Sequence, residues 1–325
     1  MSGVKVDPSF SAWVEALGPT PEPPKITTAL EYRAVADAYI GSFLNFPIPG
    51  DVVETKHTIC SYDGAEIDIY RFVRKDTAAA TTAQPALVHV HGGGIVACRI
   101  ESIGCANAAK LVSESGVQVF SVEYRVAPEF PYPIPVEDCY AALRWVSDHA
   151  RELNIDQERI GIVGESGGAC LAAGAAFLAR DRGLSPPLAK QILIYPMLDH
   201  VKPWTAEVDS ARGEYLSDYV NMLRICWSAY IGADTAGKLE AEVPSYAIPA
   251  RAKDVSGLPS TYIDVGSLDL FRDESVSFAA RLLAAGVDVE LHLYEGVPHC
   301  FDLIAPDIQI TRNAWENRHR AIRGI

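Results

Sequence analysis

The sequence has no apolar run that approaches the ~18 residues of a membrane-spanning helix, and no apolar segment typical of a secretory signal near its first residue. Its seven cysteines are scattered, and no two of them form a C-x-x-C pair. An odd, dispersed set of cysteines in a long chain indicates reduced thiols. We therefore expect a cytoplasmic protein that does not bind membranes.

Basic residues are in the minority. The chain has 28 Lys and Arg against 42 Asp and Glu, which gives a formal net charge of −14. An acidic surface repels a phosphate backbone, so nucleic acid is a poor partner. The phosphate-binding patterns G-x-x-x-x-G-K-[ST] and G-x-G-x-x-G are also missing. With 325 residues, of which 49% are hydrophobic, the chain has enough apolar mass for a large core.

The chain does contain an alternation of short β-rich runs and longer helical patterns. Runs such as "ALVHV", "VQVFSV" and "QILIY" are apolar throughout, which is typical of strands covered on both faces. The first two strands, around Tyr62-Asp63-Gly64, are predicted to form an antiparallel hairpin. Strands are expected near 54–60, 66–73, 86–90, 117–122, 160–163, 190–195, 260–265 and 288–293. Helices are expected near 105–115, 136–150, 167–182, 274–285 and 307–322. This pattern predicts an α/β protein with a mostly parallel eight-stranded sheet and helices on both faces.

Two regions interrupt this alternation. Residues 1–50 contain the proline-rich "GPTPEPPK" and an amphipathic stretch from Ala29 to Phe43. Residues 199–250 are long, aromatic and helical in part. Segments of this size between strands are often functional lids rather than plain loops.

A lone serine stands between glycines in "IGIVGESGGACLAAG", where a strand must turn into a helix. A G-x-S-x-G at such a turn strains the backbone of Ser166 and exposes its Oγ at the carboxyl edge of the sheet. The helix that follows points its first N–H groups at the same place. The pentapeptide alone also fits a glycine-rich structural turn, because chance supplies one in about a tenth of chains this long.

A second glycine-rich segment, His91-Gly92-Gly93-Gly94, directly follows the buried strand "ALVHV". Consecutive glycines suit a place where the backbone comes close to another group, although a flexible turn is an alternative. Acyl transfer needs N–H donors fixed where a carbonyl oxygen becomes an oxyanion. We predict that the N–H groups of Gly93, Gly94 and Gly167 form such an oxyanion hole.

A serine nucleophile needs a base, and the base needs an orienting acid. His299, in "YEGVPHCF", follows the strand near 288–293 and falls at the edge of the sheet where Ser166 emerges. Asp269 lies on the loop just past the strand near 260–265. Other acids nearby fall inside that strand or in the first turn of the next helix: Asp264, Asp273 and Glu274. The order Ser166, Asp269, His299 is that of the α/β-hydrolases.

These motifs resemble those of the hormone-sensitive-lipase-like family of α/β-hydrolases, a carboxylesterase group that includes relatives of the plant gibberellin receptors. The resemblance rests on "HGGG" at 91–94, "EYRVAPEFPYPIPVEDCYAALRWV" at 123–146, "GESGG" at 164–168, "YPMLD" at 195–199, "LDLFRDE" at 268–274 and "PHCF" at 298–301. It implies a catalytic triad of Ser166, Asp269 and His299, and an oxyanion hole of Gly93, Gly94 and Gly167. It also implies a hydrolase core in 51–198 and 251–325, beneath a helical cap formed by an N-terminal segment, 1–50, and an insertion, 199–250.

The sequence departs from the family at three positions near the expected site, and at the first of them Gly167 stands where the family usually has an alanine after the serine. Ile95 stands where an aromatic residue often follows the glycines, and Cys300 replaces a frequent glycine after the histidine. We expect both to shape the substrate pocket, together with Trp204 and Tyr215 of the cap insertion. Core packing explains the aromatic residues of the insertion equally well.

The expected function is that of a serine carboxylesterase that hydrolyses short- to medium-chain carboxylic esters through an acyl-enzyme intermediate. The partner is a small-molecule ester, and no metal or organic cofactor is required; His89-x-His91 is interpreted as strand packing and loop support. The motifs do not separate this activity from a lactone or amide hydrolase, or from a lyase. A non-catalytic receptor of the gibberellin-receptor type would lack the triad histidine that stands here at 299. The resemblance also suggests a homodimer through the edge strand near 288–293.

Overall fold

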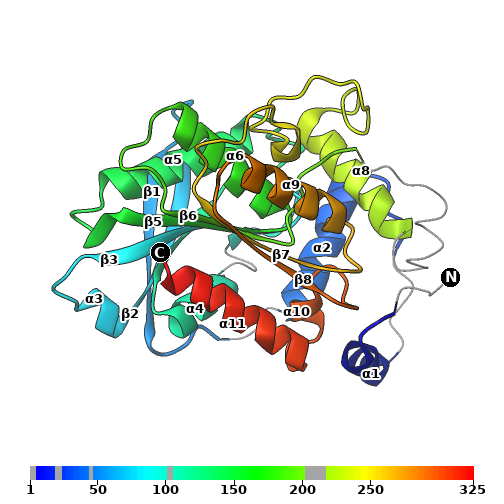
Figure 1. Ribbon diagram of the computed structural model, residues 1–325, viewed down its shortest axis with the longest axis horizontal. Coiled ribbons are helices and arrows are strands. Elements are labelled where there is room, and N and C mark those ends of the chain that lie inside the picture. The colour runs from blue at the N-terminus through cyan, green and yellow to red at the C-terminus, as the bar shows by residue number, and fades with distance from the viewer. Residues whose placement is uncertain (1–4, 19–23, 44–46, 101–104, 202–216) are drawn as a thin grey trace.

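One eight-stranded sheet runs through the molecule between two layers of helices (Figure 1). The computed structural model describes residues 5–18, 24–43, 47–100, 105–201 and 217–325. The strands are β1 (Val52–Cys60), β2 (Glu66–Arg74), β3 (Gln84–Val90), β4 (Gln118–Glu123), β5 (Ile155–Glu165), β6 (Lys190–Ile194), β7 (Ser260–Gly266) and β8 (Val289–Tyr294). Their spatial order is β1-β2-β4-β3-β5-β6-β7-β8. The β1–β2 hairpin and the β2–β4 pair are antiparallel, and the other pairs are parallel. The predicted sheet is confirmed.

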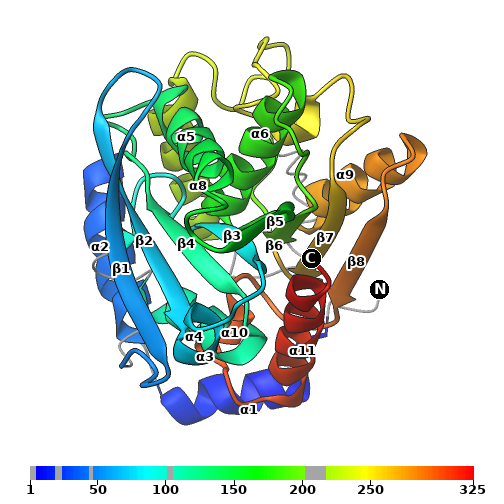
Figure 2. The same ribbon diagram turned by 90° about the vertical axis from the view of Figure 1, so that its left-hand side faces the viewer.

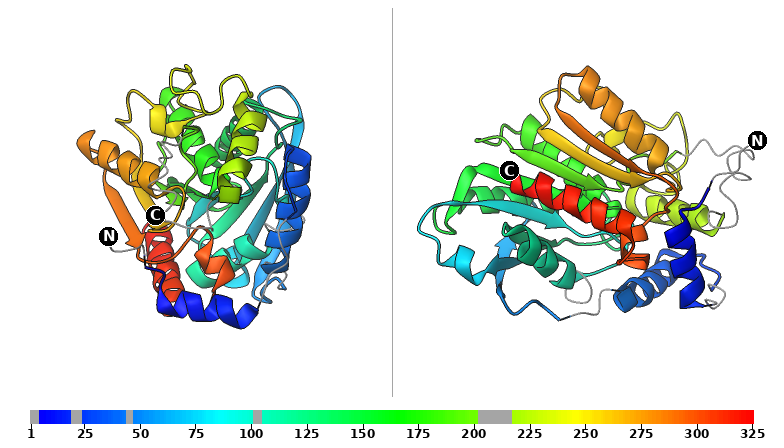
Figure 3. Two further views of the ribbon diagram at one scale, coloured as in Figure 1. Left: turned by 90° about the vertical axis from the view of Figure 1, so that its right-hand side faces the viewer. Right: turned by 60° about the horizontal axis from the view of Figure 1, so that its bottom comes forward.

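Helices cover both faces of this sheet. One face carries α4 (Cys105–Ser115) and α11 (Gln309–Arg323), and the other carries α5 (Ile134–Asp148), α6 (Gly167–Asp181) and α9 (Arg272–Ala284) (Figures 1 and 3). Leu87 and Val88, neighbours in β3, are both fully buried but belong to two different hydrophobic clusters, one under each helix layer. Burial of successive residues on opposite faces explains why these strands are apolar throughout.

Three helices stand apart from the two layers: α1 (Pro8–Leu17), α2 (Ala29–Phe43) and α8 (Ser217–Ile231). Helix α2 lies beside α8 (Figures 1 and 2), and Asn221 of α8 donates through Nδ2 to the Ile26 carbonyl at 3.1 Å. Helix α1 packs Phe10 into a cluster with Val297 and Phe301. Both segments expected to interrupt the sheet therefore contain helix.

The remaining elements are short: α3 (Lys75–Ala78), α10 (Phe301–Ile304) and the 3₁₀ turn η2 (Pro249–Arg251). Strand β5 begins at Ile155, five residues before the predicted start at 160. The sequence did not indicate the earlier start because the polar "DQER" carries no apolar signal. Within the described ranges, no helix has both the length and the apolar composition needed to cross a membrane.

Candidate active site

Ser166 stands at a sharp turn between β5 and α6, with φ 53° and ψ −118°. A Cβ added to Gly168 would lie 2.2 Å from the carbonyl oxygens of Val90 and His91, and one added to Gly164 would lie 2.5 Å from the Gly168 oxygen. No side chain fits at those distances, so both flanking glycines are required by the turn. The result is a serine side chain that projects from the carboxyl end of β5.

The loop after β3 packs directly against this turn. A Cβ added to Gly167 would lie 2.8 Å from the Gly94 Cα and 2.9 Å from the Gly94 nitrogen. The backbone has positive φ at Gly93 (105°) and Gly94 (62°). In the part of the chain that the structure describes, neither of these two N–H groups has a hydrogen-bond acceptor. The predicted oxyanion-hole residues are therefore brought together beside Ser166.

His299 and Asp269 complete a line of hydrogen bonds from the serine. His299 Nε2 lies 2.9 Å from Ser166 Oγ, and His299 Nδ1 lies 2.8 Å from Asp269 Oδ2. Asp269 is 1% exposed, and its Oδ1 accepts from the Phe271 N–H at 2.8 Å. Because the carboxylate accepts at Nδ1, the proton of a neutral ring sits there and the Nε2 lone pair faces the hydroxyl.

The loops that carry Asp269 and His299 are joined to each other. The Leu268 N–H donates to the Val297 carbonyl at 3.1 Å. A Cβ added to Gly266, at the end of β7, would lie 2.1 Å from that same carbonyl oxygen. This close approach fixes the distance between the two loops, and with it the Asp269–His299 pair.

Two aromatic rings hold the imidazole of His299 in orientation. Tyr195 lies edge-on to it at a centroid distance of 4.7 Å, and Phe271 does so at 4.9 Å. Burial of the ring lowers the pKa of His299, but the negative charge of Asp269, the Cys300 thiol and the hydrogen bonds of both outweigh burial. The pKa of His299 is therefore raised well above its usual value of 6.5.

The two histidines of His89-x-His91 brace the surroundings of the serine. His89 is fully buried, and its Nε2 lies 3.0 Å from the Glu165 carboxylate next to Ser166. The His91 ring stacks on Tyr124 at a centroid distance of 4.2 Å. Burial lowers the pKa of His91 to about 3, so this imidazole is neutral near pH 7.

The four residues predicted to line the substrate pocket differ in burial and in whether the structure describes them. Ile95 is fully buried in the hydrophobic core and has φ 66°. Cys300 is half-buried beside His299, with φ 55°. Trp204 and Tyr215 lie outside the described residues.

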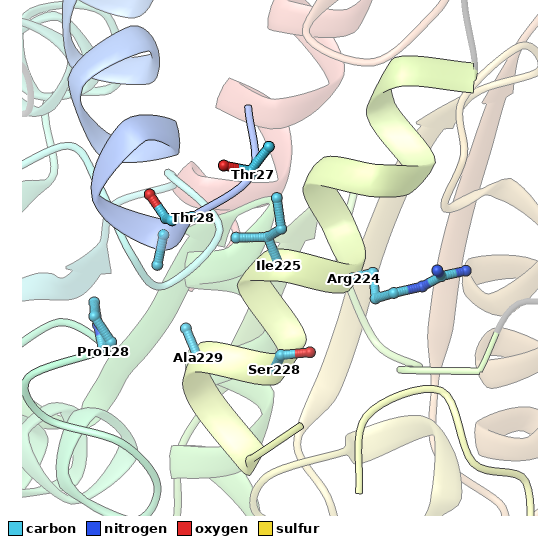
Figure 4. Close-up of a pocket in the computed structure, with 8 residues that line it drawn as sticks. Thr27, Thr28, Pro128, Arg224, Ile225, Ser228 and Ala229 are labelled. Atoms are coloured by element: carbon cyan, nitrogen blue, oxygen red, sulfur yellow. The ribbon is translucent and has the colours of Figure 1, made fainter. Parts of the chain in front are cut away.

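A cavity of about 350 Å³ lies between the start of α2 and α8 (Figure 4). It is lined by Thr27, Thr28, Ala29, Pro128, Arg224, Ile225, Ser228 and Ala229. Ile225 points towards α2, and Arg224 points away from it. Neither Ile95 nor Cys300 belongs to this lining, so the cavity differs from the predicted pocket.

Sequence reasoning missed the side chains that flank the loop after β3, residues 91–98, which we call the glycine loop. A Cβ added to Gly94 would lie 2.7 Å from Cys226 Sγ and 3.1 Å from Tyr32 Oη. A Cβ added to Gly93 would lie 2.8 Å from Cys98 Sγ. Helices α2 and α8 thus reach the loop, and the amphipathic pattern of α2 was the only sequence signal for this contact.

Residues 87–303 match the profile of the alpha/beta hydrolase fold family. Esterase LipI of Mycobacterium tuberculosis is 35% identical over 218 residues, which are 66% of this chain and 65% of LipI. Ethyl acetate hydrolase of Pseudomonas putida is 32% identical over 238 residues, which are 72% of this chain and 70% of that protein. The solved structure of a bacterial heroin esterase has a TM-score of 0.85 and 34% identity, and the match covers 98% of each chain. The chain spans just under two thirds of the length of LipI.

Proposed function

The chain belongs to the α/β-hydrolase fold family, and from this membership together with the site geometry we propose that it is a serine carboxylesterase. The observation that carries the proposal is the line of hydrogen bonds from Ser166 through His299 to Asp269. The line begins at Ser166, and the glycine loop packs against the backbone next to this serine. Nucleophile, base, orienting acid and oxyanion donors are the complete set for acyl transfer.

In the proposed reaction, Ser166 Oγ attacks the ester carbonyl carbon while His299 Nε2 takes the hydroxyl proton. The imidazolium gives this proton to the departing alcohol, and an acyl-enzyme remains. Water then loses a proton to the same nitrogen and attacks the acyl carbon. The bond to Ser166 Oγ breaks, the imidazolium returns the proton to this oxygen, and the carboxylic acid is released. Asp269 stabilises the imidazolium formed in each half of the cycle.

The N–H groups of Gly93, Gly94 and Gly167 are the proposed donors to the oxyanion of both tetrahedral intermediates. Each such donor contributes about 3 kcal/mol to transition-state stabilisation. Tight packing of Gly167 on Gly94 supports this assignment, because it leaves the two backbones in contact.

For the substrate, we propose esters with short- to medium-chain acyl groups, beneath a cap that includes α2 and α8. The relative named ethyl acetate hydrolase supports a small acyl group. Tyr32 and Cys226, from these two helices, occupy the space beyond Gly94 and thereby support closure of that side of the site.

We place the enzyme in the cytoplasm and propose that it forms a dimer through β8. The six cysteines whose side chains the structure describes are free thiols, which supports a reducing compartment. Strand β8 is an edge strand, and its Leu291 and Leu293 are 37% and 50% exposed. An open edge with exposed leucines is suited to pairing with a second chain.

Hydrolysis of a p-nitrophenyl ester series from acetate to palmitate tests the activity. Ser166→Ala and His299→Ala are each expected to lower kcat by a factor of about 10⁴ or more, since the triad acts as a unit. His149→Ala, which removes an imidazole from the end of α5, is the matched control and is expected to retain wild-type kcat. Activity that persists in both triad variants would contradict the proposal. Rates that keep rising beyond about C10 would contradict the short-acyl preference, because each added methylene would then still contribute binding energy in the pocket.

A further inference from the structure

The glycine loop is held in a conformation that its own residues do not favour. Besides Gly93 and Gly94, Ile95 (φ 66°) and Cys98 (φ 71°) have positive φ. Side chains with a Cβ rarely adopt this region, and a β-branched residue such as isoleucine does so least readily. Such a loop persists only when contacts from outside hold it in place.

Arg33 of α2 supplies the first of these contacts. Its Nε donates to the Val96 carbonyl at 2.7 Å, and its Nη2 donates to the Ala127 carbonyl at 2.8 Å. The Ala127 N–H in turn donates to the Ile95 carbonyl at 3.0 Å. The guanidinium therefore holds the backbone that follows the strained Ile95, directly at the Val96 carbonyl and through Ala127 at the Ile95 carbonyl. Its remaining N–H groups bond to the Glu129 carboxylate at 2.9 and 2.6 Å.

Asp37, one helical turn further along α2, supplies the second contact. Its Oδ1 accepts from the Cys98 N–H at 2.7 Å, at the other strained residue that carries a side chain. Residues four apart on a helix lie on the same face, so Arg33 and Asp37 reach the loop together. Cys98 Sγ in turn packs against Gly93, as noted above.

We propose that Arg33 and Asp37 are positioning residues for the oxyanion hole. Helix α2 holds residues 93–98 in the conformation that presents the N–H groups of Gly93 and Gly94 beside Ser166. This inference rests on the proposed function. Helix α2 lies outside residues 87–303, the part of the chain that matches the family. The glycine motif alone thus does not set its own geometry, and a cap helix contributes to the chemical step as well as to the pocket.

Kinetics of Arg33→Ala and Asp37→Ala test this inference, with kcat and KM measured separately. A small displacement of catalytic donors costs up to about 10²-fold in rate, so kcat is expected to fall about 10- to 100-fold with little change in KM. The affinity for a trifluoromethyl ketone, whose adduct with the serine carries an oxyanion, is expected to fall by a similar factor. Asp37→Asn is the matched control: it keeps the Oδ1 acceptor and is expected to retain wild-type values.

A second control separates this role from helix stability. Glu31→Gln alters the capping interaction of α2 with the Thr27 N–H and leaves the loop contacts intact. It is expected to change the melting temperature but neither kcat nor ketone affinity. If an alanine variant fails to fold, Arg33→Lys tests the inference in its place. Lysine keeps a positive charge next to Glu129 but cannot bond both carbonyls, so this variant is expected to lower kcat.

Unchanged kcat and ketone affinity in folded Arg33→Ala and Asp37→Ala proteins would overturn the inference, as would equal loss in Asp37→Asn and Asp37→Ala. A wild-type protein that neither hydrolyses esters nor binds the ketone would instead overturn the proposed function.

Discussion

Gly168 and His91 lie in direct backbone contact: a Cβ on Gly168 would be 2.2 Å from the His91 carbonyl oxygen. This contact joins the first turn of α6 to the end of β3. It places the serine turn and the glycine loop, which are far apart in the sequence, against each other. The site geometry therefore depends on a position where no side chain fits.

Gly168→Ala is accordingly expected to abolish activity and to lower the free energy of unfolding by several kcal/mol, because a backbone clash cannot relax by side-chain rotation. Ala169→Gly, the next residue in the same helix, is the control and is expected to cost only about 1–2 kcal/mol through helix propensity and the loss of one buried methyl group. Denaturant unfolding and ester hydrolysis measure both. A Gly168→Ala protein with wild-type stability would contradict the contact.

The pH dependence of kcat/KM reports on His299. The base is active only when neutral, so activity is lost as pH falls through its pKa, which is raised above 6.5. The acid limb of the profile is expected to lie above that value. Cys300→Ala removes one of the groups that raise this pKa and is expected to move the acid limb to lower pH. Cys60→Ala, at an exposed cysteine of β1, is expected to leave it in place. An acid limb that stays at the same pH in Cys300→Ala would contradict the assignment of Cys300 as a group that raises the pKa of His299.

Arg318 is fully buried and pairs with Asp264, at 2.6 Å, and with Asp302, at 2.5 Å, close to the loop of His299. Arg318→Met is expected to destabilise the protein by about 3–5 kcal/mol, since two buried carboxylates lose their partner. Arg144→Ala breaks only the exposed pair with Asp148 and is expected to cost under about 1 kcal/mol. Urea titration distinguishes them. Equal stabilities would show that this ion network is dispensable.

The proposed dimer is tested by light scattering during size-exclusion chromatography. Leu293→Lys places a charge on the exposed face of β8 and is expected to produce a monomer, since charged side chains protect edge strands from pairing. Val53→Lys, at a residue of the opposite edge strand β1 that is 37% exposed, is the matched control. A wild-type protein that elutes as a monomer at micromolar concentration contradicts the dimer.

The sheet and the predicted triad were accessible from the sequence because each has a local signal. Strands buried on both faces are apolar throughout, as in "QILIY", and the loops after parallel strands meet at one edge. Helix α1 was not predicted, although Asp7 followed by Pro8 is a helix-start signal. Its burial depends on contacts with the loop before His299, such as the bond from the Asp7 N–H to the Gly296 carbonyl at 2.8 Å.

The contacts of α2 with the glycine loop lay beyond the reach of sequence patterns. Arg33 and Asp37 are polar residues on a helix, which periodicity assigns to solvent. Their partners are backbone atoms of residues 96, 98 and 127, and no residue type at those positions reveals the contact. Tyr195 was part of a quoted motif, but its edge-on contact with His299 depends on how β6 and β8 are placed in the sheet.

Covalent labelling with a fluorophosphonate, followed by mass spectrometry of the digested protein, tests whether Ser166 is the nucleophile. We expect one phosphonate per chain, on Ser166, at a rate that falls sharply in His299→Ala. A folded wild-type protein in which Ser166 stays unmodified while the reagent reacts elsewhere, or not at all, would contradict it.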